Sequence, residues 1–488
     1  MSSGLILGWS LGANDAANVF GTAVGTRMVR FATAATVCSV FVILGAVVSG
    51  GGAAQTLGAL GSVNALAGAF MVALSAAAVV YLMLKAGLPV STSQAIVGAI
   101  IGWNLYSDSI TDSETLVKIV VTWVACPVLA GLIAVPLLKL VGYVLGAVRL
   151  HLLRIDAYTR LALILAGAFG SYSLGANNIA NVMGVFVDVS PFTQFAVGDL
   201  LTLTSVQQLF LLGGVAISIG VFTYSRKVML TIGRDLLPLS PVSAWVVVTA
   251  HSIVLFLFAS QGLEQWLTAH GLPALPLVPV SSTQAVVGAV VGLGLLRGGR
   301  DIDWRLLGNI GAGWVAAPVA AALVCFVALF FLQNVFNQQV YREVRYVVSS
   351  PALAQLAARG VPTAALANIE GQMFHSARAF MEGVRGAGLV EGKHDRVLRQ
   401  YAEIGPYVLS ADKLSRVDRV RMSPAQLDAL ERLEGRRFRH KWQLAEALAA
   451  ITTEWAVAGD RASRQRDKQI ERKLSYLYRV LVASPNGA

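Results

Sequence analysis

Charged residues are scarce in this sequence. Only 13% of its 488 residues are Asp, Glu, Lys or Arg, whereas 56% are hydrophobic. Soluble domains carry roughly 25% charged residues, and the mean hydropathy here is +0.65. A water-soluble protein of this length could not bury so much apolar surface. The composition therefore excludes an ordinary soluble protein and predicts an integral membrane protein.

Cysteine is scarce as well. The sequence holds three cysteines, Cys38, Cys126 and Cys325, each within an apolar stretch. An odd and sparse set provides neither a disulfide framework nor metal-ligand spacing, so we interpret these residues as small buried hydrophobes. The N-terminus lacks a basic flank and a small-residue cleavage site, which favours a retained first span over a signal peptide.

The charge that is present is concentrated in the last third of the chain. Residues 1–340 hold 14 Lys and Arg and 11 Asp and Glu, and residues 341–488 hold 24 and 16. This shift predicts a membrane part followed by a polar tail. Apolar residues at helical spacing, as in Leu427–Arg439 and Gln469–Val482, indicate that the tail is mostly helical. Its basic stretches are typical of a solvated face, with an anionic-lipid or partner site as the alternative.

Long apolar runs dominate the chain before the tail. A membrane-spanning helix needs roughly 20 apolar residues, and such runs lie near 4–26, 31–52, 63–84, 115–138, 159–186, 196–222, 242–262 and 306–332. Two shorter runs, 88–105 and 278–296, begin with Pro and hydroxyl residues. They favour broken or re-entrant helices over full spans.

Three short motifs occur twice, in the same order. Gly12–Val19 (GANDAANV) recurs as Gly175–Val182 (GANNIANV), Pro89–Ala95 (PVSTSQA) recurs as Pro279–Ala285 (PVSSTQA), and Trp123–Val128 (WVACPV) recurs as Trp314–Val319 (WVAAPV). Three collinear matches indicate that the membrane part arose by duplication.

The duplication divides the chain into four parts. We predict a first transmembrane repeat at 1–140, a basic inter-repeat loop at 141–158, a second transmembrane repeat at 159–333 and a charged, mostly helical C-terminal domain at 334–488. Basic loops would be cytoplasmic under the positive-inside rule. If 88–105 and 278–296 cross the membrane, each half has an odd number of crossings and the second copy is inverted; if they re-enter, the parity changes. The expected fold class is an all-α integral membrane protein of two inverted repeats with broken or re-entrant hairpin helices and a soluble helical tail.

The first motif places amide and carboxyl groups inside an apolar span. Its polar members are Asn14, Asp15 and Asn18 in the first copy and Asn177, Asn178 and Asn181 in the second. Polar groups at membrane depth are expensive and usually functional. With carbonyls freed by a helix break at Gly12, these oxygens suit a hard cation such as Na⁺. The alternative is hydrogen bonding between packed helices, but repetition of the motif favours the site.

The second motif carries a different chemistry. Its donors are Ser91, Thr92, Ser93 and Gln94 in the first copy and Ser281, Ser282, Thr283 and Gln284 in the second. Pro89 fixes the entry, and a hydroxyl residue can cap the helix that follows. A helix N-terminus offers unpaired N–H groups and a partial positive charge, so two such half-helices could hold one oxyanion without Lys or Arg. Simple N-capping of an ordinary span is the alternative.

At these residues the sequence resembles the inorganic phosphate transporter family. Both family signatures, at 12–18 and 89–94, are present and recur in the second half, and the resemblance covers roughly residues 4–333. It implies Na⁺- or H⁺-coupled phosphate uptake and paired hairpins that close over the substrate. Carried over to this chain, the Ser, Thr and Gln residues would contact phosphate, and the Asn and Asp residues would hold the cations or the anion nearby.

One position departs from the family pattern. Many members carry Asp in both copies of the first signature, whereas this chain has Asp15 in one and Asn178 in the other. The second copy therefore lacks a carboxylate, which leaves the number of coupled cations open. The form of both signatures is more similar to Na⁺-coupled members than to H⁺-coupled ones.

The expected function is Na⁺-coupled symport of inorganic phosphate by alternating access, in a prokaryotic plasma membrane, with no enzymatic activity and no cofactor. Two alternatives stay open. One is an H⁺-coupled phosphate or sulfate permease of the same fold, because sulfate is also tetrahedral. The other is an anion-binding sensor that signals through the tail. The expected partners are the anion and the lipid bilayer. A second copy of the chain, in a homodimer, is a further candidate, and no nucleic acid is expected.

Overall fold

A computed structural model of the protein describes residues 1–61, 63–86, 90–148, 151–192, 195–197, 201–235, 239–299, 302–389 and most of 392–482. The chain forms two compact units. The first unit comprises Met1–Tyr106, Thr111–Phe192 and Ser205–Tyr341. The second comprises Ser107–Ile110, Thr193–Thr204 and Arg342–Ala488.

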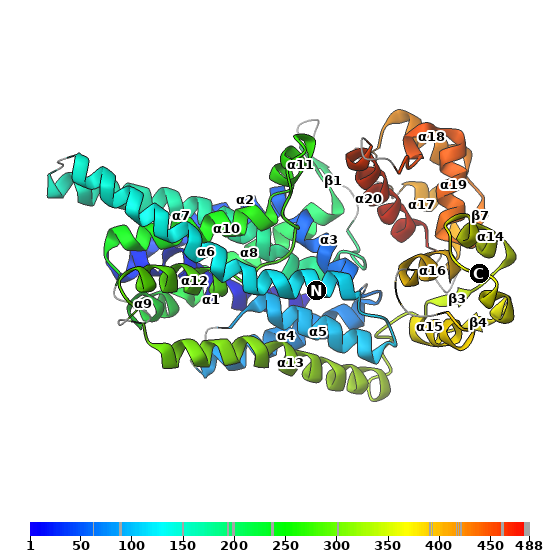
Figure 1. Ribbon diagram of the computed structural model, residues 1–488, viewed down its shortest axis with the longest axis horizontal. Coiled ribbons are helices and arrows are strands. Elements are labelled where there is room, and N and C mark those ends of the chain that lie inside the picture. The colour runs from blue at the N-terminus through cyan, green and yellow to red at the C-terminus, as the bar shows by residue number, and fades with distance from the viewer. Residues whose placement is uncertain are drawn as a thin grey trace. The chain divides into compact units, whose positions relative to one another are not determined.

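The first unit is built from helices (Figure 1). In chain order they are α1 (Ser2–Gly25), α2 (Phe31–Ser49), α3 (Gly51–Leu60), α4 (Leu66–Lys85), α5 (Thr92–Tyr106), α6 (Ser113–Ala147), α7 (Leu152–Met183) with the 3-10 turn η1 (Gly184–Phe186), α8 (Ser205–Thr223), α9 (Ser225–Asp235), α10 (Pro241–Ala259), α11 (Gln261–Ala269), α12 (Ser282–Leu296) and α13 (Trp304–Asn334).

Helix length separates membrane spans from half-helices. Within the described residues, α2, α4, α6, α8, α10 and α13 are long and apolar enough to cross a membrane. By contrast, α5 and α12 have 15 residues each. At about 1.5 Å per residue they measure about 22 Å, less than a hydrocarbon core of roughly 30 Å. The segments 88–105 and 278–296 thus contain short helices within their described residues, as expected, and whether they cross or re-enter stays a prediction.

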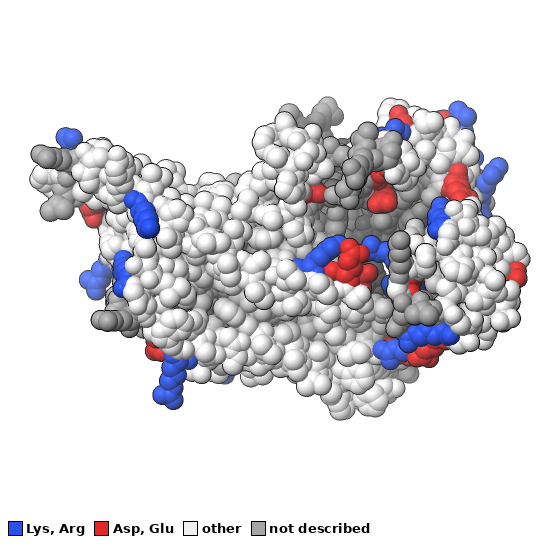
Figure 2. Space-filling view, in the orientation of Figure 1, with Lys and Arg blue, Asp and Glu red and all other residues white. Residues whose placement is uncertain are grey.

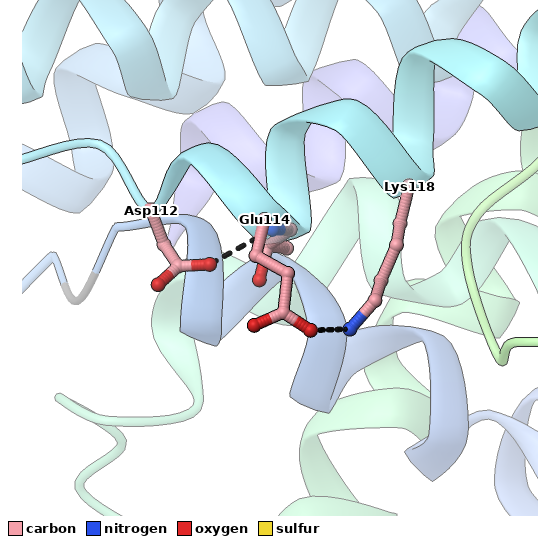
Figure 3. A network of polar contacts seen from close by, with 4 residues as sticks. Asp112, Glu114 and Lys118 are labelled. Carbon is pink, nitrogen blue, oxygen red and sulfur yellow. Dashed lines mark hydrogen bonds and ion pairs between the residues drawn. The ribbon is translucent and has the colours of Figure 1, made fainter. Parts of the chain in front are cut away.

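Polar caps mark where the two longest of these six spans, α6 and α13, begin. Asp112 accepts a hydrogen bond from the Thr115 amide at the start of α6 (2.8 Å), and Asp303 accepts one from the Leu306 amide at the start of α13 (2.9 Å). Figure 3 shows the first cap together with the Glu114–Lys118 ion pair along the same helix. Such caps satisfy amides that have no partner within the helix.

The duplication seen in the sequence extends to the packing. Helix α1 packs against α8, whereas α7, which carries the second copy of the motif, packs against α2. Likewise, α5 packs against α13 and α12 packs against α6. A glycine permits close approach at matching places: a Cβ on Gly12 would clash with the Ile217 carbonyl, and one on Gly175 with the Val42 carbonyl. Each repeat therefore builds its core with helices of the other. Inversion of the second repeat stays a prediction.

An apolar stripe lies on the outer side of α6 and of α13. Its exposed members include Val117, Val121, Val124, Val128 and Leu132 on α6 and Val315, Val319, Leu323, Val327 and Phe330 on α13. They recur every three or four positions, so they share one side of each helix. Figure 2 shows a broad face of the helical unit with few Lys, Arg, Asp or Glu side chains. This surface fits contact with lipid chains.

Three predicted boundaries of the membrane part are wrong. The segment 141–158 is not a loop, because α6 continues to Ala147 and α7 begins at Leu152. The span expected at 196–222 begins only at Ser205, since Leu201–Leu203 (β2) pairs as an antiparallel strand with Phe195–Val197 (β1). Thr202 and Thr204 favour extended backbone over helix.

The third boundary is the end of the membrane unit. This unit extends to Tyr341 instead of 333. Val340 is fully buried in the core of the helical unit, and its carbonyl accepts a hydrogen bond from Trp103 Nε1 (3.1 Å). The residues after α13 therefore pack against α5 of the same unit.

The second unit mixes short helices with short strands. Strands β3 (Arg345–Val347), β4 (Met373–Phe374) and β5 (Glu403–Ile404) form a sheet in the order β4-β3-β5, and β6 (Tyr407–Val408) pairs with β7 (Arg437–Phe438). The helices are α14 (Ser350–Ala358), η2 (Ala365–Ile369), α15 (Ala377–Gly386), α16 (Asp395–Ala402), α17 (Ala411–Ser415), α18 (Pro424–Arg432), α19 (Lys441–Ile451), η4 (Thr453–Trp455) and α20 (Arg464–Leu481).

The tail follows the helical prediction only in part. Helix α20 covers the expected Gln469–Val482 up to Leu481. The helix expected over Leu427–Arg439 is wrong beyond Arg432. Gly435 adopts φ of +79°, a conformation that favours glycine, and the chain then enters strand β7.

Candidate functional site

The Asn-containing motifs lie in the interiors of α1 and α7. Their six polar side chains are at most 6% exposed. Helix α1 continues without interruption through the motif, so the helix break expected at Gly12 is wrong. Gly12 instead lets the backbone of α8 approach at Ile217. Cation ligands at this place would therefore come from side chains.

Asp15 is the one carboxylate among these six residues. Its Oδ1 accepts a hydrogen bond from Asn14 Nδ2 (2.8 Å), and its Oδ2 accepts one from Asn178 Nδ2 (3.2 Å). Both donors are neutral amides, and no ion pair involves Asp15 within the described part of the chain. A buried carboxylate without a countercharge is costly, so this position favours a bound cation or a proton.

The Asp15 carboxylate orients the amides of the second motif. Because a carboxylate only accepts hydrogen bonds, Asn178 must present its NH2 group to Asp15. Its Oδ1 then accepts from Asn177 Nδ2 (2.9 Å) and from Asn181 Nδ2 (3.0 Å). This arrangement leaves Asn181 Oδ1 as a buried acceptor without a partner among the described residues.

The two half-helices begin beside these amides. Ser91 Oγ accepts a hydrogen bond from the Gln94 amide (3.3 Å), and Ser281 Oγ accepts one from the Gln284 amide (3.2 Å). These two serines are thus N-caps. The side chains of the next residues, from Thr92 and from Ser282 onward, are buried at the N-termini of α5 and α12, where the helix dipole is positive.

Each Asn motif holds the half-helix of the other repeat. Asn18 Nδ2 donates to Ser282 Oγ (3.0 Å), and Asn181 Nδ2 donates to Ser93 Oγ (2.8 Å). Two hydroxyls also donate hydrogen bonds to backbone carbonyls of the other repeat. Ser93 donates to the Val280 carbonyl (3.1 Å), and Thr283 donates to the Val90 carbonyl (3.4 Å). Segments from both repeats therefore meet in one polar cluster.

The structure brings the predicted site residues together in this cluster. All the predicted Ser, Thr, Gln, Asn and Asp side chains are at most 6% exposed. Thr92 Oγ1, Gln94 Oε1 and Gln284 Oε1 have no hydrogen-bond partner among the described residues, like Asn181 Oδ1. Unpaired buried polar atoms are rare in folded proteins and call for a ligand, ion or water. Pro89, expected to fix the entry of the first half-helix, lies outside the described residues.

The sequence reasoning missed one polar residue at the cluster. His251, in the apolar helix α10, is fully buried, and its Nε2 lies 2.9 Å from Ser282 Oγ. The signal was available, because an ionisable residue inside an apolar span indicates function by default. His251 belongs to neither duplicated motif, so the motif comparison did not select it.

Comparison with known proteins identifies the family. A sequence model of a protein family, described as the phosphate transporter family, matches residues 11–325 and 273–483. The chain belongs to this family. It is therefore a transporter and not an enzyme, a multi-pass protein of the plasma membrane whose membrane unit is helical, and phosphate is the substrate of the family.

Individual relatives agree with this assignment. A protein of Methanocaldococcus jannaschii that carries the provisional name phosphate permease is 26% identical over 322 residues, which cover 65% of this chain and 91% of the relative. The sodium-dependent phosphate transporter 1-A of Xenopus laevis is 31% identical over 170 residues, or 34% of this chain and 22% of the relative. A solved structure named the sodium-dependent phosphate transporter is similar with a TM-score of 0.53 and 26% identity, over 68% of this chain and 98% of that one.

Proposed function

We propose that this phosphate transporter is a Na⁺-coupled symporter that works by alternating access. The observation that carries the proposal is the polar cluster between the repeats. It combines one uncompensated carboxylate with two half-helix N-termini, where the Thr92 hydroxyl and the side-chain oxygens of Gln94 and Gln284 have no hydrogen-bond partner among the described residues. A cation and an anion can therefore bind close together, each offsetting the charge of the other.

Phosphate would bind at the N-termini of α5 and α12. The donors proposed for it are Ser91, Thr92, Ser93 and Gln94 with Ser281, Ser282, Thr283 and Gln284. Ser91 and Ser281 cap the half-helices and act chiefly by holding the amides in place. Neither copy of either duplicated motif contains Lys or Arg. A neutral donor cage favours release of the anion as well as its capture.

Na⁺ would bind first, beside Asp15. The oxygens proposed as ligands or supports are those of Asn14, Asp15, Asn18, Asn177, Asn178 and Asn181. Cation binding neutralises the carboxylate and lowers the negative potential that would repel phosphate. Relatives named as sodium-dependent phosphate transporters support this choice of cation. One carboxylate in place of two favours fewer coupled cations than in members with two Asp residues.

The test is uptake of radiolabelled phosphate into proteoliposomes, with and without an inward Na⁺ gradient and with excess unlabelled sulfate. Uptake that requires Na⁺ and is unaffected by sulfate supports Na⁺/phosphate symport. Uptake driven by a pH gradient, or abolished by sulfate, would move the protein to the H⁺-coupled or sulfate-permease alternative. Cross-linking of the reconstituted protein would separately test the homodimer.

A further inference from the structure

His251 touches the proposed anion site through one hydroxyl. Its ring is 0% exposed inside α10, and Nε2 lies 2.9 Å from Ser282 Oγ. The other ring nitrogen, Nδ1, has no hydrogen-bond partner among the described residues. The hydrogen bond to Ser282 is thus the polar interaction that this buried imidazole makes.

Ser282 has a second neighbour that fixes part of its geometry. Asn18 Nδ2 donates to Ser282 Oγ at 3.0 Å, so one lone pair of the hydroxyl is already occupied. A serine hydroxyl has one hydrogen to donate and two lone pairs that accept. Whether the Ser282 hydroxyl presents its hydrogen or a lone pair to a ligand therefore depends on whether His251 Nε2 donates or accepts the hydrogen bond between them.

The two tautomers of His251 have opposite consequences for an anion. If Nε2 accepts, the Ser282 hydrogen points at the ring, and the remaining lone pair faces the site, where it repels an oxyanion. If Nε2 carries the hydrogen, both lone pairs are occupied and the Ser282 hydrogen is free to donate to the anion. The second arrangement also spares the protein an unpartnered Nδ1–H group in the apolar interior.

The corresponding hydroxyl of the first repeat lacks this constraint. Thr92 occupies the matching place in the first half-helix, and its Oγ1 has no partner among the described residues. The site is therefore asymmetric. One hydroxyl can rotate to donate or accept, and the other is held by Asn18 and His251.

We propose that His251 is a positioning residue that, as the neutral Nε2–H tautomer, holds the Ser282 hydroxyl as a dedicated hydrogen-bond donor to the bound oxyanion. This inference rests on the proposed anion site at the two half-helices. It assigns His251 a role through Ser282 and no direct contact with phosphate.

The test combines phosphate binding to the purified full-length protein with uptake in proteoliposomes. His251→Phe keeps a ring of similar size but removes the N–H group, so the Kd and the KM for phosphate should rise by about tenfold, the value of one hydrogen bond to an anion. The maximal rate should change much less. His251→Gln, which can present an N–H group to Ser282, should recover most of the affinity. His270→Phe, outside the cluster at the end of α11, is the matched control and should leave both values unchanged.

A double-mutant comparison with Ser282 distinguishes a positioning role of His251 from a purely packing role. Ser282→Ala alone should weaken phosphate binding, and His251→Phe added to it should weaken binding no further. Additive losses, or an unchanged Kd in His251→Phe, would overturn the inference while leaving the anion site intact. An unchanged Kd in Ser282→Ala would instead remove Ser282 from the proposed anion site, and the inference with it.

A measurement on the unaltered protein guards against a variant that fails to fold. Nitrogen NMR of phosphate-loaded protein carrying ¹⁵N-labelled histidine reports which ring nitrogen bears the hydrogen. His251→Gln identifies the signal of His251 among the six histidines. The Nε2–H tautomer supports the inference, and the Nδ1–H tautomer would overturn it.

Discussion

The Asn178 amide donates a hydrogen bond to the Asp15 carboxylate across the two repeats, with Nδ2 and Oδ2 3.2 Å apart. These two residues occupy the same position in the duplicated motif. The single change between them, NH2 in place of O⁻, makes the two halves of the cluster unequal. It also places a neutral donor where a second carboxylate would repel the first.

Restoring the second carboxylate should strengthen cation binding. In Asn178→Asp, two carboxylates would stand side by side and could not both stay ionised without a cation or proton between them. We expect the Na⁺ concentration that gives half-maximal uptake at pH 8 to fall by at least about tenfold, since charges about 4 Å apart interact by several kcal/mol in a medium of intermediate polarity. Asn178→Ser, which adds no charge, is the control. An unchanged Na⁺ requirement in Asn178→Asp would show that Asp15 and Asn178 take no part in cation binding.

Removing the first carboxylate should abolish coupling. Asp15→Asn keeps the size of the side chain but leaves the cluster without a negative group. Phosphate uptake should fall by at least about tenfold, and the residual flux should no longer respond to a Na⁺ gradient. The measurement is initial uptake at saturating phosphate with and without Na⁺, alongside thermal stability in detergent. Full Na⁺-dependent uptake in this variant would disprove a cation role for Asp15.

Much of this site was predictable because its two parts are duplicated in the sequence. Repetition of GANDAAN and PVSTSQ singled out the amides, the carboxylate and the hydroxyls before their contacts were known. Their crossed pairing was not predictable. Asn18 holds Ser282, and Asn181 holds Ser93, because each helix packs with a helix of the other repeat. Local periodicity contains no information on such long-range packing.

The boundaries that failed have different causes. Apolar periodicity marks where a helix is buried in lipid or core, but α6 continues to Ala147, beyond its most apolar stretch. The hairpin before α8 forms between two strands that are close in sequence, β1 and β2, whereas strand β7 pairs with β6, from which α17 and α18 separate it along the chain. His251 was missed because it is a single residue outside every repeat.

The close contact at Gly12 should make this glycine difficult to replace. A Cβ there would clash with the Ile217 carbonyl, and backbone atoms cannot move aside without separating α1 from α8. Gly12→Ala should lower thermal stability in detergent by several degrees, in line with the 1–3 kcal/mol typical of overpacking. Gly142→Ala, on α6 with no atom within 4 Å of the added Cβ, is the matched control. Equal melting temperatures for the two variants would contradict the packing of α1 on α8.

The end of the membrane unit predicts where the tail can be removed. A chain that stops after Tyr341 keeps the buried Val340 and the Trp103 hydrogen bond to its carbonyl (3.1 Å). This chain should retain Na⁺-dependent phosphate uptake in proteoliposomes. A chain that stops after Asn334 loses that contact and should be less stable by about 1 kcal/mol or more. Loss of transport in the longer of the two chains would favour the sensor alternative, in which the tail is needed for function.

Acid should destabilise the second unit through His440. This residue is 1% exposed, its Nδ1 donates to the Glu403 carbonyl (2.9 Å), and burial lowers the pKa of its imidazole below 6.5. In the unfolded chain the ring binds a proton at about pH 6.5, whereas in the folded unit it stays neutral to lower pH. The unfolded state therefore binds more protons between the two pKa values, and its relative stability increases there as the pH falls.

Hydrogen exchange across α19, which begins beside His440, should report this effect. Protection of Lys441–Ile451 should be constant above about pH 7 after correction for intrinsic exchange, and should decline as the pH falls through 6.5. In His440→Asn, which has no group that titrates in this range, protection should not change with pH over the same interval. Protection that declines equally in both proteins would assign the acid sensitivity to another group.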